Sequence, residues 1–387
     1  MKSICIISQR YPCSVTPSVH VFVQKLAWAM ADKGIEVHVI SPVPVYSKNF
    51  RAMPEKQIEL TLEGNCLTVY RPKFFYLGER KIGPLRLSHL SADRMYFAAR
   101  NMIEKYDIDV EVFYGHFICV AGICACRLGR YYHKPAYVAY GESSDWSLHG
   151  FGLRAIKKEI REISGFIAVS TRNKKELIQN GLADTNNVKV FVNGVNENIF
   201  YPRDKMISRK KFGLNPDDFI VAFVGQFTDR KGVLRLSEAL ETMKEPVHAI
   251  YAGKGKLKPS GKHVSYCGIV SPEEIPFFLS AADAFALPTR NEGCCNAILE
   301  AVACGVPVIS SDCDFNYDIL EREYAILINP DSINEIQNAV RELYYNPDQC
   351  RQMGSSALEK RKMFTLKKRA EKIIEWIDLR NKEYVQR

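Results

Sequence analysis

The sequence predicts an α/β protein with two doubly wound domains, each a parallel sheet covered by helices. Its 387 residues exceed what one ordinary hydrophobic core supports, so two domains are expected. Residues 283–310 have the pattern of a buried strand, a loop, a helix and a second buried strand. The first 40 residues show a similar order, with an apolar run, an amphipathic stretch and another apolar run. Strands that alternate with helices in this way are typical of parallel sheets.

The composition indicates a globular protein. Apolar residues make up 47% of the chain and charged residues 25%. No apolar run approaches the ~20 residues that span a bilayer, and the run at the start is too short for a signal-peptide core. The twelve cysteines show no paired C-x-x-C spacing. This favours a reduced, cytoplasmic compartment and argues against a structural metal.

A net charge of +9 points to an acidic partner without naming it. Nucleotide phosphates, nucleic acid and an anionic membrane surface all fit, and so does a simple role in solubility.

In the N-terminal half, apolar spacing predicts a helix over 19–30 that ends at Gly34. The expected strands are 4–8, 35–40, 110–114, 135–140, 166–170 and 188–192. His116 follows the strand 110–114, at the sheet edge where ligands bind in parallel α/β folds. A lone histidine is more often structural than catalytic, so position alone does not assign it a role.

The polar stretch 197–217 contains Pro202, Gly213 and Pro216 and is the best candidate for a linker. After it, apolar runs predict strands at 219–224, 247–252, 264–267, 284–287, 306–309 and 325–328. Residues 271–274, Ser-Pro-Glu-Glu, predict a capping box that starts a helix before Asp283. Three polar helical stretches close the chain, and the last has an apolar face.

The helix expected over 295–304 stops at Gly305. Its faces are apolar or small except for Glu300, so it is expected to be largely buried. Glu292 lies in the loop before it, and the side chain of Glu300 points back toward the helix N-terminus. Both carboxylates can therefore address one space, together with the free N–H groups of the first turn, which suit a diphosphate. From these residues alone, a structural pairing of Glu300 and a solvated Glu292 remain open.

Residues 292–301, Glu-Gly-x-x-Asn-x-x-Leu-Glu-Ala, followed by Ala-Cys-Gly-Val-Pro-Val, resemble the signature of glycosyltransferase family 4. Members of that family are retaining enzymes with the GT-B fold, two Rossmann-like domains that face each other across a cleft. The resemblance implies that Glu292 lies near the transferred sugar and that Glu300 binds the ribose hydroxyls of a nucleotide-sugar donor. Cys294 and Cys295 depart from the usual pattern, an aromatic or aliphatic residue followed by proline.

Further positions match the same family. Lys231 and Gly232 resemble its phosphate-binding pair, although Gln226 stands where an arginine is usual, and Arg230 is expected to compensate. His116 resembles the active-site histidine, so Glu292 and His116 are the expected catalytic residues. In the first loop, Ser18 and Val19 stand where glycine is usual. The residues expected to bind the donor are Gly225, Arg230, Lys231, Gly293, Cys294, Asn296, Ala297 and Glu300.

Residues 71–86 mix basic and aromatic side chains, and 154–161 carry a second basic run. Such a mixture suits an anionic membrane, single-stranded nucleic acid or an ordinary surface loop. Our hypothesis is that both stretches face a membrane that carries a lipid-linked acceptor.

The domains expected are 1–200 for the acceptor, a linker at 201–217, 218–364 for the donor, and a final helix, 365–387, that returns to the first domain. The predicted activity is retaining transfer of a sugar from a nucleotide-diphosphate sugar to a glycan or lipid-linked acceptor, in cell-surface polysaccharide biosynthesis. No cofactor, metal or nucleic-acid partner is expected, and localisation is cytoplasmic or peripheral on the inner face of the membrane. The alternatives are an epimerase or phosphorylase of the same fold, or a non-enzymatic binder of anionic surfaces.

Overall fold

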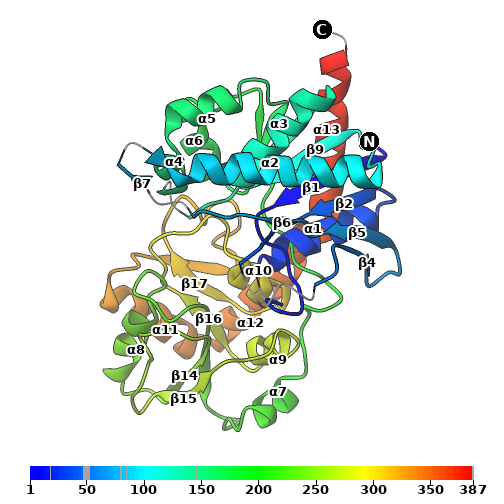
Figure 1. Ribbon diagram of the computed structural model, residues 1–387. Helices are drawn as coiled ribbons and strands as arrows, with labels where there is room; N and C mark the ends of the chain where they lie inside the picture. Colours follow the sequence, from blue (N-terminus) through cyan, green and yellow to red (C-terminus); the bar gives the residue numbers. More distant parts are fainter. Residues whose placement is uncertain (18, 47–52, 79–80, 84, 144–145, 386–387) are drawn as a thin grey trace. The chain divides into compact units, whose positions relative to one another are not determined.

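The computed structural model describes residues 1–17, 19–46, 53–78, 81–83, 85–143 and 146–385. The chain divides into two compact units (Figure 1). Unit 1 comprises Met1–Phe191 and Leu366–Arg387, and unit 2 comprises Val192–Thr365. Ser18, Glu79, Arg80 and Pro84, which belong to stretches interpreted above, lie outside the described residues.

Unit 1 contains an eight-stranded sheet in the order β12-β11-β10-β9-β1-β2-β5-β4, counted over the described residues. All neighbours are parallel except β4 and β5. The strands are β1 (Ser3–Ser8), β2 (Glu36–Ile40), β4 (Lys56–Leu60), β5 (Cys66–Tyr70), β9 (Val112–His116), β10 (Ala136–Tyr140), β11 (Gly165–Ala168) and β12 (Val188–Val190). Two short pairs join β3 (Val43–Pro44) to β6 (Lys73–Phe74), and β7 (Lys81–Ile82) to β8 (Leu85–Arg86).

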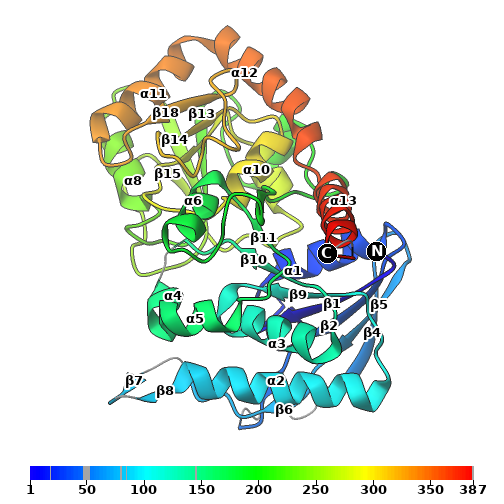
Figure 2. The same ribbon diagram turned by 90° about the horizontal axis from the view of Figure 1, so that it is seen from above.

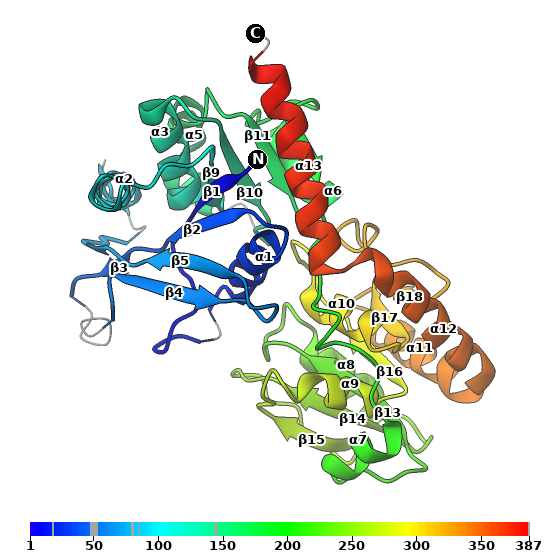
Figure 3. The same cartoon turned by 90° about the vertical axis from the view of Figure 1, so that its right-hand side faces the viewer.

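Both faces of this sheet are covered, which explains why its central strands are continuous apolar runs. Along β1, Ile4 and Ile6 belong to one hydrophobic core, whereas Cys5 and Ile7 belong to the other. Figures 2 and 3 show helices α2 and α3 on one side of the sheet and α1 and α13 on the other. The helices of unit 1 are α1 (Val21–Ala31), α2 (Leu87–Tyr106), α3 (Ile123–Tyr132), α4 (Trp146–Phe151), α5 (Leu153–Glu159), α6 (Thr171–Gln179) and α13 (Leu366–Val385).

The C-terminal helix α13 is part of the core of unit 1. Ile373 and Ile377 are fully buried among residues of α1 and the sheet. The ring of Trp376 lies 5.6 Å from that of Tyr137, and the Tyr137 hydroxyl donates a 2.7 Å hydrogen bond to Asn381.

Unit 2 contains a six-stranded, fully parallel sheet in the order β15-β14-β13-β16-β17-β18. Its strands are β13 (Phe219–Val224), β14 (Val247–Ala252), β15 (Val264–Gly268), β16 (Ala284–Leu287), β17 (Val308–Ser311) and β18 (Ala325–Ile328). Its helices are α7 (Lys205–Lys211), α8 (Val233–Glu241), α9 (Ile275–Ser280), α10 (Asn296–Ala303), α11 (Ile333–Tyr345) and α12 (Pro347–Lys360). Because the strand order reverses direction at β13 and β16, right-handed connections place α8 and α10 on opposite faces.

The predicted α/β fold class is therefore confirmed, with one local prediction wrong. Residues 272–274 form a turn, and α9 begins only at Ile275, with Pro276 in its first turn. The hydroxyl of Ser271 donates to the carboxylate of Glu274 at 3.1 Å instead of capping a helical N–H group. No helix in the described part of the chain is long and apolar enough to cross a membrane.

Candidate active site

In unit 2, the loop between β13 and α8 is shaped by glycines. Gly232 has φ +75°, and a Cβ atom there would lie 2.2 Å from the carbonyl oxygen of Pro288, so only glycine fits. Gly225 is less constrained, because its nearest neighbours to a Cβ would be 3.6 Å away. This packing holds the loop against the carboxyl end of β16, where parallel α/β sheets bind ligands.

Glu292 lies in the loop after β16 and is 8% exposed. One oxygen, Oε1, accepts from Lys231 Nζ at 2.6 Å, from Arg230 Nη1 at 2.8 Å and from the Thr289 hydroxyl at 2.9 Å. Arg230 also donates to the backbone carbonyl of Asn291. The alternative considered above, in which Glu292 is solvated, is therefore wrong. A buried carboxylate needs this many donors to offset the loss of water.

The cluster of Glu292, Arg230, Lys231 and Thr289 brings together one carboxylate and two cations. Its formal charge is +1, at the carboxyl edge of a parallel sheet. An anion that enters can form ion pairs with Arg230 and Lys231, and the carboxylate of Glu292 can then interact with a group that carries partial positive charge.

The N-terminus of α10 adjoins this cluster in sequence. The side-chain amide of Asn193 donates to Asn296 Oδ1 at 2.9 Å and to the carbonyl oxygen of Cys294 at 3.4 Å. Cys295 is the N-cap residue, and burial raises the pKa of its thiol to about 11. Glu300 is partly buried, one turn after Asn296. Helix termination at Gly305, φ +74°, is as predicted.

His116 is the last residue of β9 in unit 1 and is 4% exposed. Its ring lies 5.2 Å from that of Phe22 and 4.8 Å from that of Phe117. Its Nδ1 atom is buried and has no hydrogen-bond partner among the described residues. Burial lowers the pKa of His116 well below its usual value, and the charge of Arg369 adds to this effect. The imidazole is therefore neutral near pH 7 and able to accept or donate one hydrogen bond.

Sequence reasoning missed a second histidine, His20, which lies with Phe22, His116 and Phe117 in a group that we call the histidine cluster. His20 caps α1 with φ 51°, and its ring lies 5.6 Å from that of Phe117. Burial lowers the pKa of His20 to about 4, helped by the charge of Arg10. Thr289 and Asn193 were also missed as partners. Asn193 bonds residues that lie 101 and 103 positions along the chain, whereas Thr289 lies three residues before Glu292 and its hydroxyl was not considered.

The twelve cysteines all lie within the described residues, and none of them forms a disulfide bond there. Over the same residues, no group of three or more His, Cys, Asp or Glu side chains could hold a metal ion.

Two protein-family models match the chain. "Glycosyltransferase Family 4" matches residues 19–198, and "Glycosyl transferases group 1" matches residues 204–360. The chain belongs to glycosyltransferase family 4. It is a glycosyltransferase, and members of this retaining family draw the sugar from a nucleotide-sugar donor.

Curated relatives of this family 4 enzyme are identical to it at about a quarter of the aligned positions. The glycosyltransferase TuaC of Bacillus subtilis, named for teichuronic acid biosynthesis, is 26% identical over 88% of both chains. The alpha-galactosylglucosyldiacylglycerol synthase of Streptococcus pneumoniae is 27% identical over 57% of this chain and 62% of its own.

Solved structures show that this family 4 enzyme has the GT-B fold. Sucrose-phosphate synthase of Thermosynechococcus elongatus aligns over the whole of both chains with a TM-score of 0.78 and 18% identity. Anabaena HepE, in complex with UDP, aligns over 98% of this chain and all of its own, with a TM-score of 0.75 and 17% identity.

Proposed function

We propose that this enzyme transfers a sugar, with retention of anomeric configuration, from a nucleotide-diphosphate sugar to a glycan or lipid-linked acceptor in cell-surface polysaccharide biosynthesis. Unit 2 binds the donor and unit 1 binds the acceptor. The observation that carries the proposal is the pairing of Glu292 with Lys231 and Arg230 at the carboxyl edge of β16.

The diphosphate of the donor is the leaving group, and its negative charge grows as the glycosidic bond breaks. Lys231 and Arg230 supply positive charge for it, and the free N–H groups at the start of α10 supply hydrogen bonds. Gly225, Gly293, Cys294 and Ala297 lie on the loops and the helix turn that would approach the nucleotide. Glu300 would bind the ribose hydroxyls.

The sugar ring becomes positively charged as the bond breaks, and the carboxylate of Glu292 would orient the ring and offset this charge. A covalent role is not assigned to Glu292. In this scheme the departing phosphate accepts the proton of the acceptor hydroxyl on the same face of the sugar. His116, held neutral by burial, would position the acceptor through one hydrogen bond.

Support for the acceptor class comes from the relatives. TuaC is named for teichuronic acid biosynthesis, and the pneumococcal synthase is named for a glycolipid, alpha-galactosylglucosyldiacylglycerol. In unit 1, the guanidinium of Arg86 donates to the carbonyl oxygens of His149 and Gly150, at 2.7 and 2.6 Å. These bonds join the first basic stretch, 71–86, to the chain just before the second, 154–161. In the same part of unit 1, Phe75 is 60% exposed and Trp146 is 64% exposed. Both features favour peripheral contact with an anionic membrane.

Neutralising the basic run tests this membrane contact. Binding to phosphatidylglycerol vesicles should fall at least tenfold when three exposed cations become glutamine, because each is worth about 1 kcal/mol near an anionic surface. If the triple variant sediments with these vesicles as well as the wild type does, the membrane contact is refuted. The cations to change are Arg154, Lys157 and Lys158.

The donor proposal is tested by thermal-shift measurements with UDP, GDP and ADP. One of these diphosphates should raise the melting temperature, and its sugar conjugates should then be screened for transfer to glycan and lipid-linked acceptors. Conversion of the nucleotide sugar without any acceptor would indicate an epimerase. Indifference to all three diphosphates would end the proposal.

A further inference from the structure

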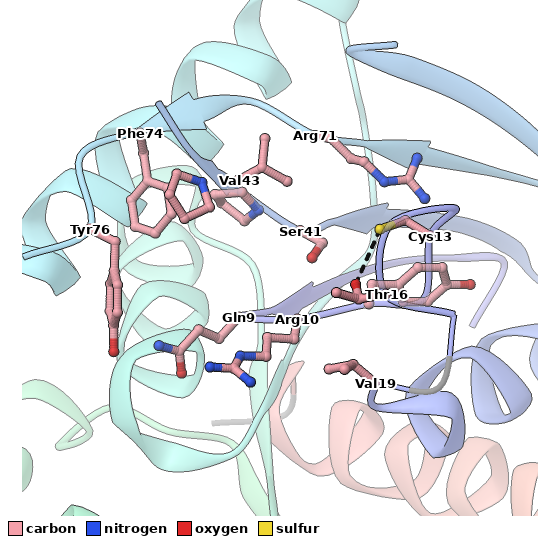
Figure 4. A pocket seen from close by; sticks show the side chains of 13 residues that line it. Gln9, Arg10, Cys13, Thr16, Val19, Ser41, Val43, Arg71, Phe74 and Tyr76 are labelled. Atoms are coloured by element: carbon pink, nitrogen blue, oxygen red, sulfur yellow. Dashed lines mark hydrogen bonds between the residues drawn. The ribbon is translucent and has the colours of Figure 1, made fainter. Parts of the chain in front are cut away.

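Unit 1 contains a cavity of about 310 Å³ at the carboxyl ends of three parallel strands. Gln9 and Arg10 follow β1, Ser41 follows β2, and Arg71 follows β5 (Figure 4). The described residues that line it include two arginines and no aspartate or glutamate. The cavity is therefore electropositive.

The charge of Glu59 partly offsets that of Arg71, whereas Arg10 forms no ion pair within the described residues. Arg71 is buried and donates to Gln57 at 2.9 Å and to the carbonyl oxygen of Pro12 at 3.2 Å, both uncharged acceptors. Arg10 is exposed, and within the described residues its guanidinium forms no hydrogen bond or ion pair. A guanidinium with unused donors at the mouth of a cavity suits a carboxylate or a phosphate.

The remaining wall is apolar and aromatic. Val43, Pro44, Phe74 and Tyr76 line the cavity, and the rings of Phe74 and Tyr76 lie 6.0 Å apart. Such surfaces pack against the C–H faces of a sugar ring, whereas the side chains of Gln9 and Ser41 can bond its hydroxyls. A binding site with apolar walls and a few convergent polar groups is typical for a small ligand.

The cavity also adjoins the histidine cluster of the same unit. Arg10 is close enough to His20 for its charge to lower the pKa of that ring. His20 in turn contacts Phe117, and Phe22 contacts His116, at ring distances of 5.6 and 5.2 Å. A ligand held at Arg10 therefore lies next to the cluster that contains His116.

We propose that this cavity binds the acceptor through a negatively charged group, the carboxylate of an acidic sugar or a phosphate, which Arg10 receives while the sugar ring packs on Phe74 and Tyr76. This inference rests on the proposed function, since it specifies the chemical class of acceptor that unit 1 takes.

Cys13 provides a direct measure of occupancy. It lines the cavity, with its Sγ atom 3.2 Å from the Thr16 hydroxyl (Figure 4). The full-length protein is treated with iodoacetamide, and alkylation of the Cys13 peptide is followed by mass spectrometry. The probes are phenyl β-D-glucoside, phenyl β-D-glucuronide and phenyl β-D-glucoside 6-phosphate, which share the phenyl group and the sugar ring and differ in charge.

An anionic probe should protect Cys13 at a concentration at least tenfold lower than the neutral glucoside does. R10Q should abolish this preference, because one charge-assisted hydrogen bond accounts for about a factor of ten. R94Q, which removes an exposed arginine on α2, is the matched control and should keep the preference. Stronger protection by the glucuronide assigns an acidic sugar, and stronger protection by the phosphate assigns a phosphorylated acceptor.

Equal protection by charged and neutral probes, or an unchanged preference in R10Q, would overturn the inference. Thermal shifts with nucleoside diphosphates, measured on the same samples, separate this failure from that of the proposed function. A protein that binds a diphosphate but shows no charge preference at Cys13 keeps the function and loses the inference. A protein with the reverse behaviour loses the function.

Discussion

Glu292→Gln separates the two roles proposed for this carboxylate. In the wild type, Oε1 accepts from Lys231, Arg230 and Thr289 at 2.6 to 2.9 Å. Glutamine keeps the shape and one acceptor oxygen but removes the negative charge. A diphosphate on the far side of Lys231 would lie roughly 5 Å from the carboxylate. At that distance the repulsion is worth about 0.8 kcal/mol in water and about 3 kcal/mol at the lower dielectric of a protein surface.

We therefore expect Glu292→Gln to bind the nucleoside diphosphate at least about fourfold more tightly, since 1.4 kcal/mol is a factor of ten. Turnover should fall about a hundredfold, because a preorganised charge that faces the reacting sugar is removed. Calorimetric titration measures the first quantity and initial transfer rates measure the second. Glu238→Gln, on the exposed face of α8, is the control for loss of a surface carboxylate.

Wild-type turnover in Glu292→Gln would refute the catalytic assignment. Loss of diphosphate binding together with turnover would instead show that Glu292 only maintains the loop. Thermal unfolding should be recorded in parallel, because two cations lose their charged partner and stability is expected to drop by about 1–2 kcal/mol.

Three other changes test separate parts of the structure. Gly232→Ala should cost about 3 kcal/mol or more in urea unfolding, because φ is +75° and Pro288 blocks a Cβ, whereas Gly225→Ala should cost less than about 1 kcal/mol. His20→Asn should reduce the loss of thermal stability between pH 6.5 and 4. The pKa of His20 in the folded protein, about 4, lies below its value in the unfolded chain, so the unfolded chain binds more protons in that window. The wild type therefore loses stability as the pH falls, and the variant should lose less. Arg230→Gln should weaken diphosphate binding about tenfold, and adding Gln226→Arg should restore it; no recovery would argue against compensation between these positions.

Much of the fold could be predicted from the sequence because its sheets are parallel and buried on both faces. The strands expected at 284–287 and 325–328 coincide with β16 and β18, and Gly305 ends α10 where its position requires. The start of α9 could not be predicted in this way. The Ser271–Glu274 pattern satisfies a local capping rule, but its side chains bond each other, and the helix begins at Ile275 with Pro276 in its first turn.

The site was harder to predict than the fold, because its contacts join distant residues. Motif spacing placed Glu292 and Lys231 near one ligand, yet it gave no indication that they bond each other across a separation of 61 residues. The cavity at Arg10 depends on three strands that meet only in the folded sheet. Pattern reasoning within a short window contains no information about such contacts.

The position of Arg230 gives a physical account of the departure at Gln226. Gln226 is exposed and its amide carries no charge, so it cannot neutralise a diphosphate. Arg230 lies directly before Lys231, and its guanidinium reaches the same carboxylate oxygen as the lysine. Two cations therefore still converge on one point, although one of them comes from a different place in the loop. Because electrostatic stabilisation depends on where charge is held rather than on which residue carries it, the proposed function predicts that this loop can still stabilise a departing diphosphate.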